Sequence, residues 1–338
     1  MSAVRVVIVD DSPVARAVLR EILEHDGDIA VVGEAGDGGQ AVALVEQLRP
    51  DVATIDIQMP DVDGWLATER IMARRPTPIL VVTARPVDAA LAFEAVRRGA
   101  LDLVFKPPLG DDAAGRALRE HVRLLARTPV VRHLRALDRE RTPVPVPLAR
   151  KAARLVGIAG SAGGPRALAT ILGGLPKSFP AAIAVVQHLP AGFTAAFARF
   201  LGSITPLEVT VVERAAPLRP ATVYLAAEDR HLAVSRAGVA SEGGPAENGF
   251  RPSASVLFRT LAVAFGAGAI GVILSGIGND GVSGLDAVQA QGGLTIAQNE
   301  ETSVVYGMPR AAVAAGVCKL VLDVQAIAGT LIERTRSP

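Results

Sequence analysis

The residues in the second half of the chain that could do chemistry begin with Ser161, in the glycine-rich turn GIAGSAGGP at residues 157–165. Small residues two positions before and after a serine let a strand turn sharply into a helix and expose the hydroxyl at the sheet edge. Free N–H groups at the start of that helix can hold an oxyanion. The pattern favours a serine nucleophile, although helix capping alone also produces it.

The same glycines could instead hold a phosphate. A dinucleotide-binding turn has the spacing Gly-x-Gly-x-x-Gly, followed about 20 positions later by an acidic residue for the ribose. The glycine spacing differs here, and no Asp or Glu occurs between Arg166 and Leu207. A loop ending in Gly-Lys-Ser/Thr is also missing from the sequence. Nucleophile chemistry is therefore the better interpretation of this turn.

A serine hydroxyl needs a base, and histidine is the usual one. His188 directly follows the apolar run AIAVVQ and precedes LPAG, so it stands at a strand end as Ser161 does. His231 begins a strand, and we expect it to be structural. The other histidines are expected at the surface of the first domain or in the linker: His25, His121 and His133.

The base in turn needs an acid that orients it. Asp280 lies in a glycine-rich turn after the run GVILSG, which repeats the construction around Ser161. Two other aspartates compete for this role: Asp229 and Asp286. The candidate triad is Ser161, His188 and Asp280. Its chain order differs from those of α/β hydrolases, chymotrypsin and subtilisin, so its roles depend on geometry.

Polar residues of the first domain also end a series of strand-like runs: Asp10, Asp11, Asp56, Thr83 and Lys106. The carboxyl ends of strands in a doubly wound parallel sheet meet at one edge, where ligands bind. Three carboxylates there repel one another unless a cation intervenes, and such oxygen ligands suit Mg²⁺. A lysine and a hydroxyl beside the metal are what a transferred phosphoryl group needs. A single acid of this kind could simply cap a helix, but the five together favour a phosphoryl site.

The elements that must position these residues follow a simple rhythm. Short β-branched runs alternate with segments of helical spacing over the first hundred residues, and again from about residue 152. This predicts two α/β domains with doubly wound, mostly parallel sheets, a flavodoxin-like first domain and a larger, Rossmann-like three-layer second domain. The segment DRERTPVPVPLARK is charged and then proline-alternating, which breaks the pattern. We place the domains at residues 1–125 and 152–338, with a linker at 126–151.

Composition excludes several classes of protein. The net charge of +1 gives no general attraction to nucleic acid or to anionic membranes, and the single cysteine, Cys318, fits a reducing cytosol. Residues 261–278 are uncharged, but their five glycines favour a helix, a turn at Gly266–Gly268 and a buried strand at 270–275 over a membrane span. We expect a soluble, monomeric cytoplasmic protein without a nucleic-acid partner or membrane insertion.

The motifs VDDS, DIQMPDVDG, TA and KP resemble the receiver domain of two-component response regulators over residues 4–125. The resemblance implies that Asp56 accepts a phosphoryl group from a histidine kinase. It assigns Thr83 and Lys106 to the phosphoryl oxygens. The implied ligands of Mg²⁺ are Asp10, Asp11, Asp56 and the backbone carbonyl of Gln58. Leu103 stands where receivers often have an aromatic switch residue.

The motifs GSAGGP, QHLPAGFTAAFA, VYLAAEDRHL, RPSASVLF, SGIGNDGVSGL and IAQNEETSVVYGMPRAA resemble the catalytic domain of the chemotaxis protein-glutamate methylesterases over residues 152–335. The resemblance implies hydrolysis of glutamate γ-methyl esters, and deamidation of glutamines, on the signalling helices of methyl-accepting chemoreceptors. It implies no cofactor in this domain. Ser161 would be the nucleophile, His188 the base and Asp280 its orienting acid, with the backbone N–H groups of Ala162 and Ile277 at the oxyanion.

Two departures from that family motivate an alternative. Ala162 replaces a threonine that usually follows the serine, and Ser255 stands where an acid is often found. The alternative is a receiver-controlled interaction module with a weak or repurposed hydrolase domain, in a chemosensory pathway unrelated to motility.

Overall fold

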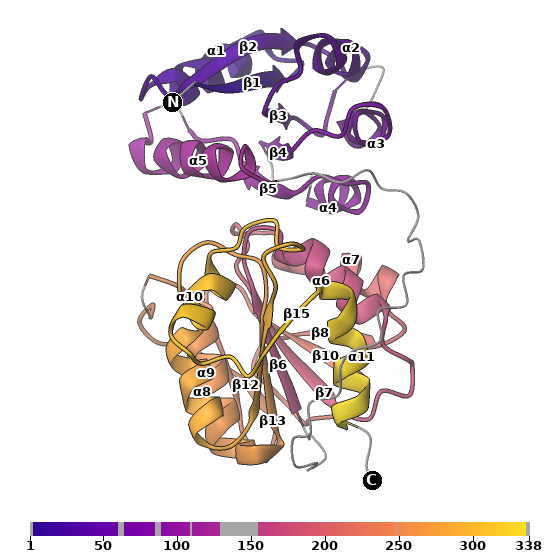
Figure 1. Cartoon of the computed structure of the whole chain (residues 1–338), viewed down its shortest axis with the longest axis vertical. Helices are drawn as coiled ribbons and strands as arrows, with labels where there is room; N and C mark the ends of the chain where they lie inside the picture. Colours follow the sequence, from indigo (N-terminus) through magenta and orange to yellow (C-terminus); the bar gives the residue numbers. More distant parts are fainter. Residues whose placement is uncertain are drawn as a thin grey trace. The chain divides into compact units, whose positions relative to one another are not determined.

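The computed structural model describes residues 3–59, 64–84, 89–108, 110–128, 155–247 and 249–335. These residues form two compact units, one before residue 140 and one after it (Figure 1). Residues 129–151 of the predicted linker, His133 among them, lie outside the described residues, as do residues 60–63 of the motif DIQMPDVDG. The exact domain boundaries therefore stay predictions.

The first unit is a five-stranded parallel sheet with helices on both faces, as expected. Its strand order is β2-β1-β3-β4-β5. Helices α1 and α5 pack together, and α3 packs between α2 and α4. The elements are β1 (Val4–Val9), α1 (Pro13–Glu24), β2 (Ile29–Ala35), α2 (Gly38–Leu48), β3 (Val52–Ile55), α3 (Gly64–Arg74), β4 (Ile79–Thr83), α4 (Ala89–Arg97), β5 (Asp102–Phe105) and α5 (Asp112–Leu125).

Local sequence explains where several of these helices begin. The Ser12 hydroxyl accepts a hydrogen bond from the Ala15 N–H, and Pro13 follows at the first helical position of α1. A capping oxygen satisfies an otherwise unpaired N–H, and proline loses nothing at that position. Because Ser12 caps α1, the neighbouring Asp11 is left for other chemistry.

The second unit is a seven-stranded parallel sheet in the order β15-β14-β13-β6-β7-β10-β8. Helices α8, α9 and α10 cover one face, and α6, α7 and α11 cover the other (Figure 1). The strands are β6 (Leu155–Gly160), β7 (Ala182–Gln187), β8 (Glu208–Val212), β10 (Thr222–Ala226), β13 (Ala269–Ile273), β14 (Leu294–Gln298) and β15 (Leu320–Leu322). The helices are α6 (Gly164–Gly173), α7 (Thr194–Ile204), α8 (Ala254–Phe265), α9 (Val282–Ala290), α10 (Met308–Ala314) and α11 (Val324–Thr335).

Glycines in the two central strands allow the helices to pack closely. A Cβ at Gly157 of β6 would lie 2.9 Å from a Leu261 methyl carbon, and one at Gly271 of β13 would lie 2.6 Å from a Leu285 methyl carbon. Phe258 of α8 fills the space over both glycines and is fully buried. The sheet edge that carries the candidate triad therefore rests on a tightly packed core.

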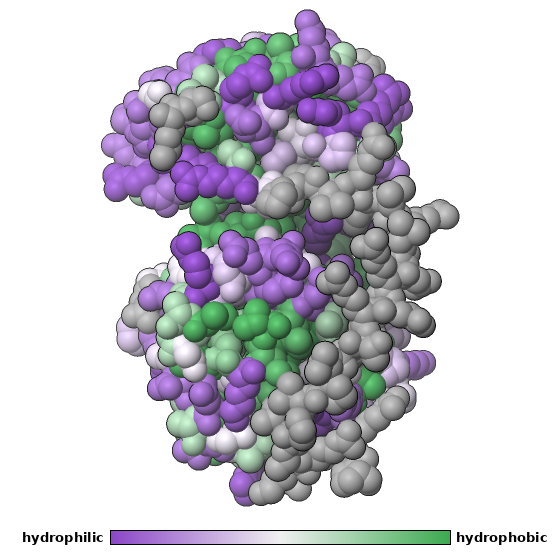
Figure 2. All heavy atoms as spheres, viewed as in Figure 1, coloured by the Kyte–Doolittle hydropathy of each residue, from purple (hydrophilic) through white to green (hydrophobic). Residues whose placement is uncertain are grey.

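The apolar stretch 261–278 forms the elements predicted for it. Helix α8 ends at Phe265, a short 3₁₀ helix covers Gly266–Gly268, and β13 follows. No helix among the described residues is long and apolar enough to cross a membrane. On the face shown in Figure 2, hydrophilic residues are interspersed with smaller hydrophobic areas.

A small antiparallel sheet, which the sequence pattern did not reveal, sits beside the second sheet. It contains β9 (Ala215–Ala216), β11 (His231–Val234) and β12 (Val239–Glu242) in the order β11-β12-β9. Strand β11 packs against α8. The loop that connects β12 to α8, residues 243–253, ends next to the candidate triad, because the Ser253 hydroxyl donates to Asp280 Oδ1 over 2.8 Å.

Candidate functional sites

The three candidate triad residues follow three neighbouring strands. Ser161 comes directly after β6, His188 after β7, and Asp280 lies in the turn after β13; β6 is flanked by the other two. The His188 N–H donates to the Gly160 carbonyl over 3.0 Å, and the Ser161 N–H donates to the Ser275 carbonyl over 3.0 Å. Parallel pairing thus brings residues far apart in sequence to one edge, as the sheet rule predicts.

His188 and Asp280 are in direct contact. The His188 Nε2 lies 3.1 Å from Asp280 Oδ2. The other ring nitrogen, Nδ1, is buried and has no hydrogen-bond partner among the described residues. Because a carboxylate can only accept, Asp280 holds the proton on Nε2 and leaves the basic lone pair on Nδ1.

Asp280 is fully buried and stays ionised. Burial raises the pKa of its carboxyl, but the hydrogen bonds from His188, from the Ala254 N–H and from the Ser253 hydroxyl outweigh burial and lower the pKa from 3.8 to about 2. Ser253 is the N-cap of α8, so the carboxylate also lies at the positive end of a helix. An ionised acid in this place can orient an imidazole and stabilise its protonated form.

The turn that carries Ser161 depends on glycine. Gly163 has φ +74°, and a Cβ there would lie 2.4 Å from Val304 Cβ. A Cβ at Gly276 would lie 2.8 Å from Ser161 Cβ and closer still to the Met308 sulfur. The side chain of Gln187 ties this turn to the next strand end, since its Nε2 donates to the carbonyls of Ser161 (2.7 Å) and His188 (3.0 Å).

A second set of bonds holds the residue after the serine. The Ser275 hydroxyl donates to the Ala162 carbonyl over 2.6 Å and accepts from the Val305 N–H over 2.9 Å. The backbone N–H groups of Ala162 and Ile277 make no hydrogen bond to any other residue that the structure describes. Two unpaired donors near the serine are what an oxyanion site requires.

The competing residues have other partners. Asp229 has a 70% exposed side chain that forms an ion pair with Arg251, and Asp286 is exposed on α9. His231 has bonds at both ring nitrogens: Nε2 lies 3.0 Å from the Pro245 carbonyl, and Nδ1 accepts from the Ser253 N–H over 3.2 Å. His231 is therefore structural, as expected.

Three further residues support the candidate triad: Ser253 and Phe250 were not singled out from the sequence, and Ser255 was noted only as a departure from the family pattern. Ser253 has a recognisable signal, a serine directly before an apolar helical run. The Ser255 N–H donates to Asp280 Oδ1 over 3.1 Å, and its hydroxyl accepts from the Gly281 N–H over 2.9 Å, so this residue supports the acid. The ring of Phe250 stacks on the His188 imidazole, with centroids 4.3 Å apart and planes 8° from parallel. Nothing in the sequence of that loop indicates the stack.

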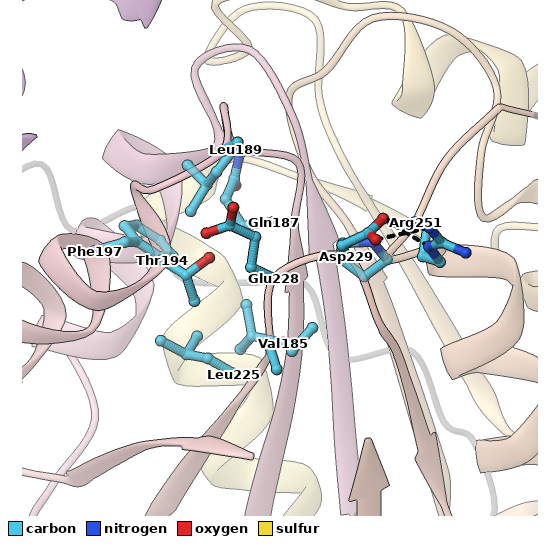
Figure 3. A pocket seen from close by; sticks show the side chains of 13 residues that line it. Val185, Gln187, Leu189, Thr194, Phe197, Leu225, Glu228, Asp229 and Arg251 are labelled. Atoms are coloured by element: carbon cyan, nitrogen blue, oxygen red, sulfur yellow. Dashed lines mark hydrogen bonds and ion pairs between the residues drawn. The ribbon is translucent and has the colours of Figure 1, made fainter. Parts of the chain in front are cut away.

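A cavity of about 360 Å³ lies beside the base and is drawn in Figure 3. Two of its lining residues, Gln187 and Leu189, flank His188 in sequence. Its floor is apolar, and its mouth carries Glu228, Asp229 and Arg251. A concave space with apolar walls and a polar rim next to a base can take part of a substrate.

The acidic residues of the first unit also come together. Carboxylate oxygens of Asp10, Asp11 and Asp56 all lie within 4.8 Å of one another. The Lys106 Nζ lies 2.7 Å from Asp10 Oδ2 and 2.6 Å from Asp56 Oδ2. This oxygen donor set fits Mg²⁺, which takes carboxylates and keeps several waters.

Burial and the lysine act in opposite directions on Asp56. Burial raises the pKa of this carboxyl, and the hydrogen bond from Lys106 offsets only part of the rise. Burial lowers the pKa of Lys106, but its bonds to Asp10 and Asp56 outweigh burial and raise that pKa. The lysine is therefore a positive charge fixed directly beside the candidate phosphoryl acceptor.

The remaining predicted residues of this site lie at the expected strand ends. Thr83 is buried at the end of β4, and the Lys106 N–H donates to its carbonyl over 2.8 Å. Gln58 is exposed two positions after Asp56. Leu103 is buried within β5, so a small aliphatic side chain occupies the position of the expected switch residue.

The prediction that His121 lies at the surface is wrong. His121 on α5 is only 21% exposed at its side chain, and its Nε2 lies 3.1 Å from Asp102 Oδ2. The His121 imidazole on α5 thus covers the buried Asp102 carboxylate of β5, a contact that helical spacing alone cannot show. His25 is 67% exposed, as expected.

Comparison with known proteins matches both units. Residues 6–114 match the response regulator receiver domain and residues 156–331 the CheB methylesterase domain. A protein-glutamate methylesterase/protein-glutamine glutaminase from Anaeromyxobacter dehalogenans is 44% identical, covering 98% of this chain and 97% of the relative. One from Myxococcus xanthus is 43% identical, covering 98% and 97%.

A solved structure agrees with the second unit. The CheB methylesterase catalytic domain of Thermotoga maritima is 37% identical with a TM-score of 0.52, covering 54% of this chain and 99% of that one. The matches to the two relatives extend over nearly the whole of this chain and of each relative. The chain therefore belongs to the CheB methylesterase family, with a response regulator receiver domain ahead of the methylesterase domain.

Proposed function

We propose that this chain hydrolyses glutamate γ-methyl esters, and deamidates glutamines, on the signalling helices of chemoreceptors. The relatives named above carry this pair of activities in their names. The observation that carries the proposal is the state of His188: Asp280 binds its Nε2, while Nδ1 is buried without a partner at the strand end next to Ser161. A base in this state is ready to accept a serine proton.

The proposed reaction has two halves. In the first, the Ser161 hydroxyl gives its proton to His188 Nδ1 as its oxygen attacks the ester carbonyl carbon. The negative oxygen of the tetrahedral intermediate accepts hydrogen bonds from the N–H groups of Ala162 and Ile277. The intermediate then breaks its bond to the methoxy group, and the proton on His188 goes to that group and releases methanol. A glutamyl ester of Ser161 remains.

In the second half, His188 takes a proton from water, and the resulting hydroxide attacks the glutamyl ester. The bond to Ser161 breaks, its oxygen recovers the proton from His188, and the glutamic acid side chain leaves and loses its remaining proton to the solvent. A glutamine follows the same course with ammonia as the first leaving group. Asp280 stays ionised throughout, since its pKa of about 2 lies far below neutral pH.

We further propose that phosphorylation of Asp56 by a chemosensory histidine kinase activates this hydrolysis. An Asp56 oxygen would attack the phosphorus of a phosphohistidine, and the histidine would leave. Lys106 would pair with the transferred oxygens, and Thr83 would bind them. Asp10, Asp11, Asp56 and the Gln58 carbonyl would hold Mg²⁺, which when bound supplies neutralisation of phosphoryl charge.

Methanol release from methylated receptor membranes tests the proposal. The full chain should release methanol, a phosphoryl donor should raise the rate, and Ser161→Ala should reduce it to background. Ser178→Ala, at an exposed position after α6, is the matched control and should behave as the wild type. Equal release by wild type and Ser161→Ala would reject esterase activity and favour the interaction-module alternative.

A further inference from the structure

The His188 imidazole is held from two directions. Its Nε2 lies 3.1 Å from Asp280 Oδ2, and Phe250 stacks on one face of the ring at a centroid distance of 4.3 Å. A hydrogen bond at a single atom fixes that atom but lets the ring tilt about it. A parallel ring stacked on the face removes that tilt. The two contacts together define where the unpaired Nδ1 lies.

In the described part of the chain, no second hydrogen bond limits the tilt of the His188 ring. Nδ1 itself has no partner, so the ring has one hydrogen bond only. Rotation by even a small angle would move Nδ1 relative to Ser161, and misplacement by about 1 Å can cost a catalytic group about 100-fold in rate. The stack is therefore the contact on which the direction of the base depends.

Phe250 is itself fixed by its loop. Its backbone N–H and carbonyl both bond to Glu247, at 3.0 Å each, and the Glu247 carboxylate forms an ion pair with Arg259 on α8. The next residue, Arg251, bonds to both carboxylate oxygens of Asp229 over 2.7 Å. A loop anchored on both sides of the phenylalanine can present its ring at a fixed angle.

The tip of the same ring reaches the turn of the acid. A Cβ placed at Gly278 would lie 3.9 Å from the Phe250 Cζ, in ordinary van der Waals contact. Gly278 lies between Ile277, a proposed oxyanion donor, and Asn279, which precedes the acid. The ring thus fills the space between the base and the turn that supplies two other parts of the proposed machinery.

We infer that Phe250 is a positioning residue for the base: its flat face holds the His188 imidazole at the angle at which Nδ1 accepts the serine proton. The inference rests on the proposed function and adds a residue to it. It requires the flat ring, so an aliphatic side chain of similar volume cannot replace it, whereas another aromatic ring can.

The test uses the full chain with the substitutions Phe250→Leu, Phe250→Met, Phe250→Tyr and Phe250→Trp. The first two should lower kcat for methanol release by about 3- to 10-fold, the range expected for loss of an aromatic pair, with little change in KM. Tyrosine should restore most of the rate, and tryptophan part of it. Phe265→Leu, the same change at a partly buried ring at the end of α8, should leave kcat unchanged.

A second readout separates positioning from substrate contact. A small phosphonofluoridate reacts with activated serines and does not contain the receptor helix of the natural substrate. Its rate of reaction with Ser161 should fall in Phe250→Leu by the same factor as kcat. The melting temperature of Phe250→Leu should stay close to that of Phe265→Leu.

The inference is overturned by three results. These are wild-type kcat in both Phe250→Leu and Phe250→Met, a loss that lies in KM with an unchanged probe rate, and failure of tyrosine to restore the rate. If Ser161→Ala releases methanol as fast as the wild type, the proposed function fails instead, whatever the Phe250 variants do.

Discussion

Asp280 accepts hydrogen bonds from four described groups, and only one of them belongs to His188. The other donors are the Ser253 hydroxyl and the N–H groups of Ala254 and Ser255, all at the start of α8. The N-terminus of α8 thus fixes the position of Asp280, and Asp280 in turn fixes the position of His188. This explains how a residue in a flexible sequence such as Gly-Asn-Asp-Gly can serve as a rigid part of a site.

Replacement of this acid by its amide tests both roles. We expect Asp280→Asn to lower kcat by about 10³- to 10⁴-fold, because an amide can present its NH₂ to the ring and favour the wrong tautomer of His188. Methanol release from methylated receptor membranes measures the loss. Asp286→Asn, on the exposed side of α9, is the matched control, and a comparable loss there would contradict the assignment of Asp280.

At the scale of elements, the turn between β6 and α6 is set by backbone space. Gly163 has a positive φ, and its missing side chain leaves room for Val304 from the segment after β14. Ser275, after β13, bonds to both this turn and that segment. Three strand ends therefore share one packed contact, and the serine turn cannot change shape alone.

Gly163→Ala is expected to destabilise the methylesterase domain by about 2–4 kcal/mol, since the left-handed backbone and the overlap with Val304 both oppose a Cβ. Esterase activity should fall with it. Calorimetric unfolding of the full chain measures the change. The contrasting variant is Gly202→Ala on α7, where a Cβ meets nothing within 4 Å and helix propensity should add about 0.5–1 kcal/mol of stability.

A histidine on α5, His121, and an aspartate on β5, Asp102, form an ion pair that exists only while the histidine is protonated. Burial lowers the pKa of His121, but the Asp102 carboxylate outweighs burial and raises it above 6.5. A raised pKa in the folded state means that the charged pair stabilises folding fully below pH 6.5. That contribution is lost as the pH rises through the raised value.

We therefore expect the receiver domain to lose stability as the pH rises above 6.5 and through the raised pKa of His121, and His121→Gln to remove most of that loss. Urea unfolding followed by the fluorescence of Trp65, the chain's single tryptophan and a residue of α3, reports this domain. His25→Gln, at an exposed position, should keep the dependence. A His121→Gln protein with an unchanged pH slope would refute the assignment.

At the scale of the whole molecule, two sites of different chemistry occupy separate units. One gathers carboxylates around a lysine and the other gathers a serine, a histidine and an aspartate, each at the carboxyl edge of its own parallel sheet. If the proposed regulation holds, removal of Mg²⁺ or of the phosphoryl acceptor Asp56 should abolish the response to a phosphoryl donor and leave basal hydrolysis unchanged. None of the steps proposed for the hydrolytic site uses Mg²⁺.

Asp56→Asn is expected to abolish the rise in methanol release that a phosphoryl donor produces, while the basal rate stays at the wild-type level. Chelation of Mg²⁺ should have the same effect on the wild type. Asp112→Asn, an exposed acid at the start of α5, should remain responsive. A basal rate that falls with Asp56→Asn, or a donor response that survives it, would contradict phosphorylation of this residue.

The sequence alone determined the pattern of strands and helices and which chemical groups end the strands. Hydrophobic periodicity predicted two parallel-sheet domains, and the glycine spacing around Ser161 excluded a dinucleotide turn. Because strand ends of a parallel sheet converge, even the partnership of His188 with Asp280 followed from local pattern.

Only the tertiary structure decided what surrounds those residues. The stack of Phe250 on His188, the cap of α8 on Asp280 and the cover of His121 over Asp102 all join segments distant in sequence. Local pattern cannot reveal such contacts, because they depend on how whole elements pack and on where a loop such as 243–253 is anchored. Periodicity specifies which residues face a sheet edge, and packing specifies which of them meet.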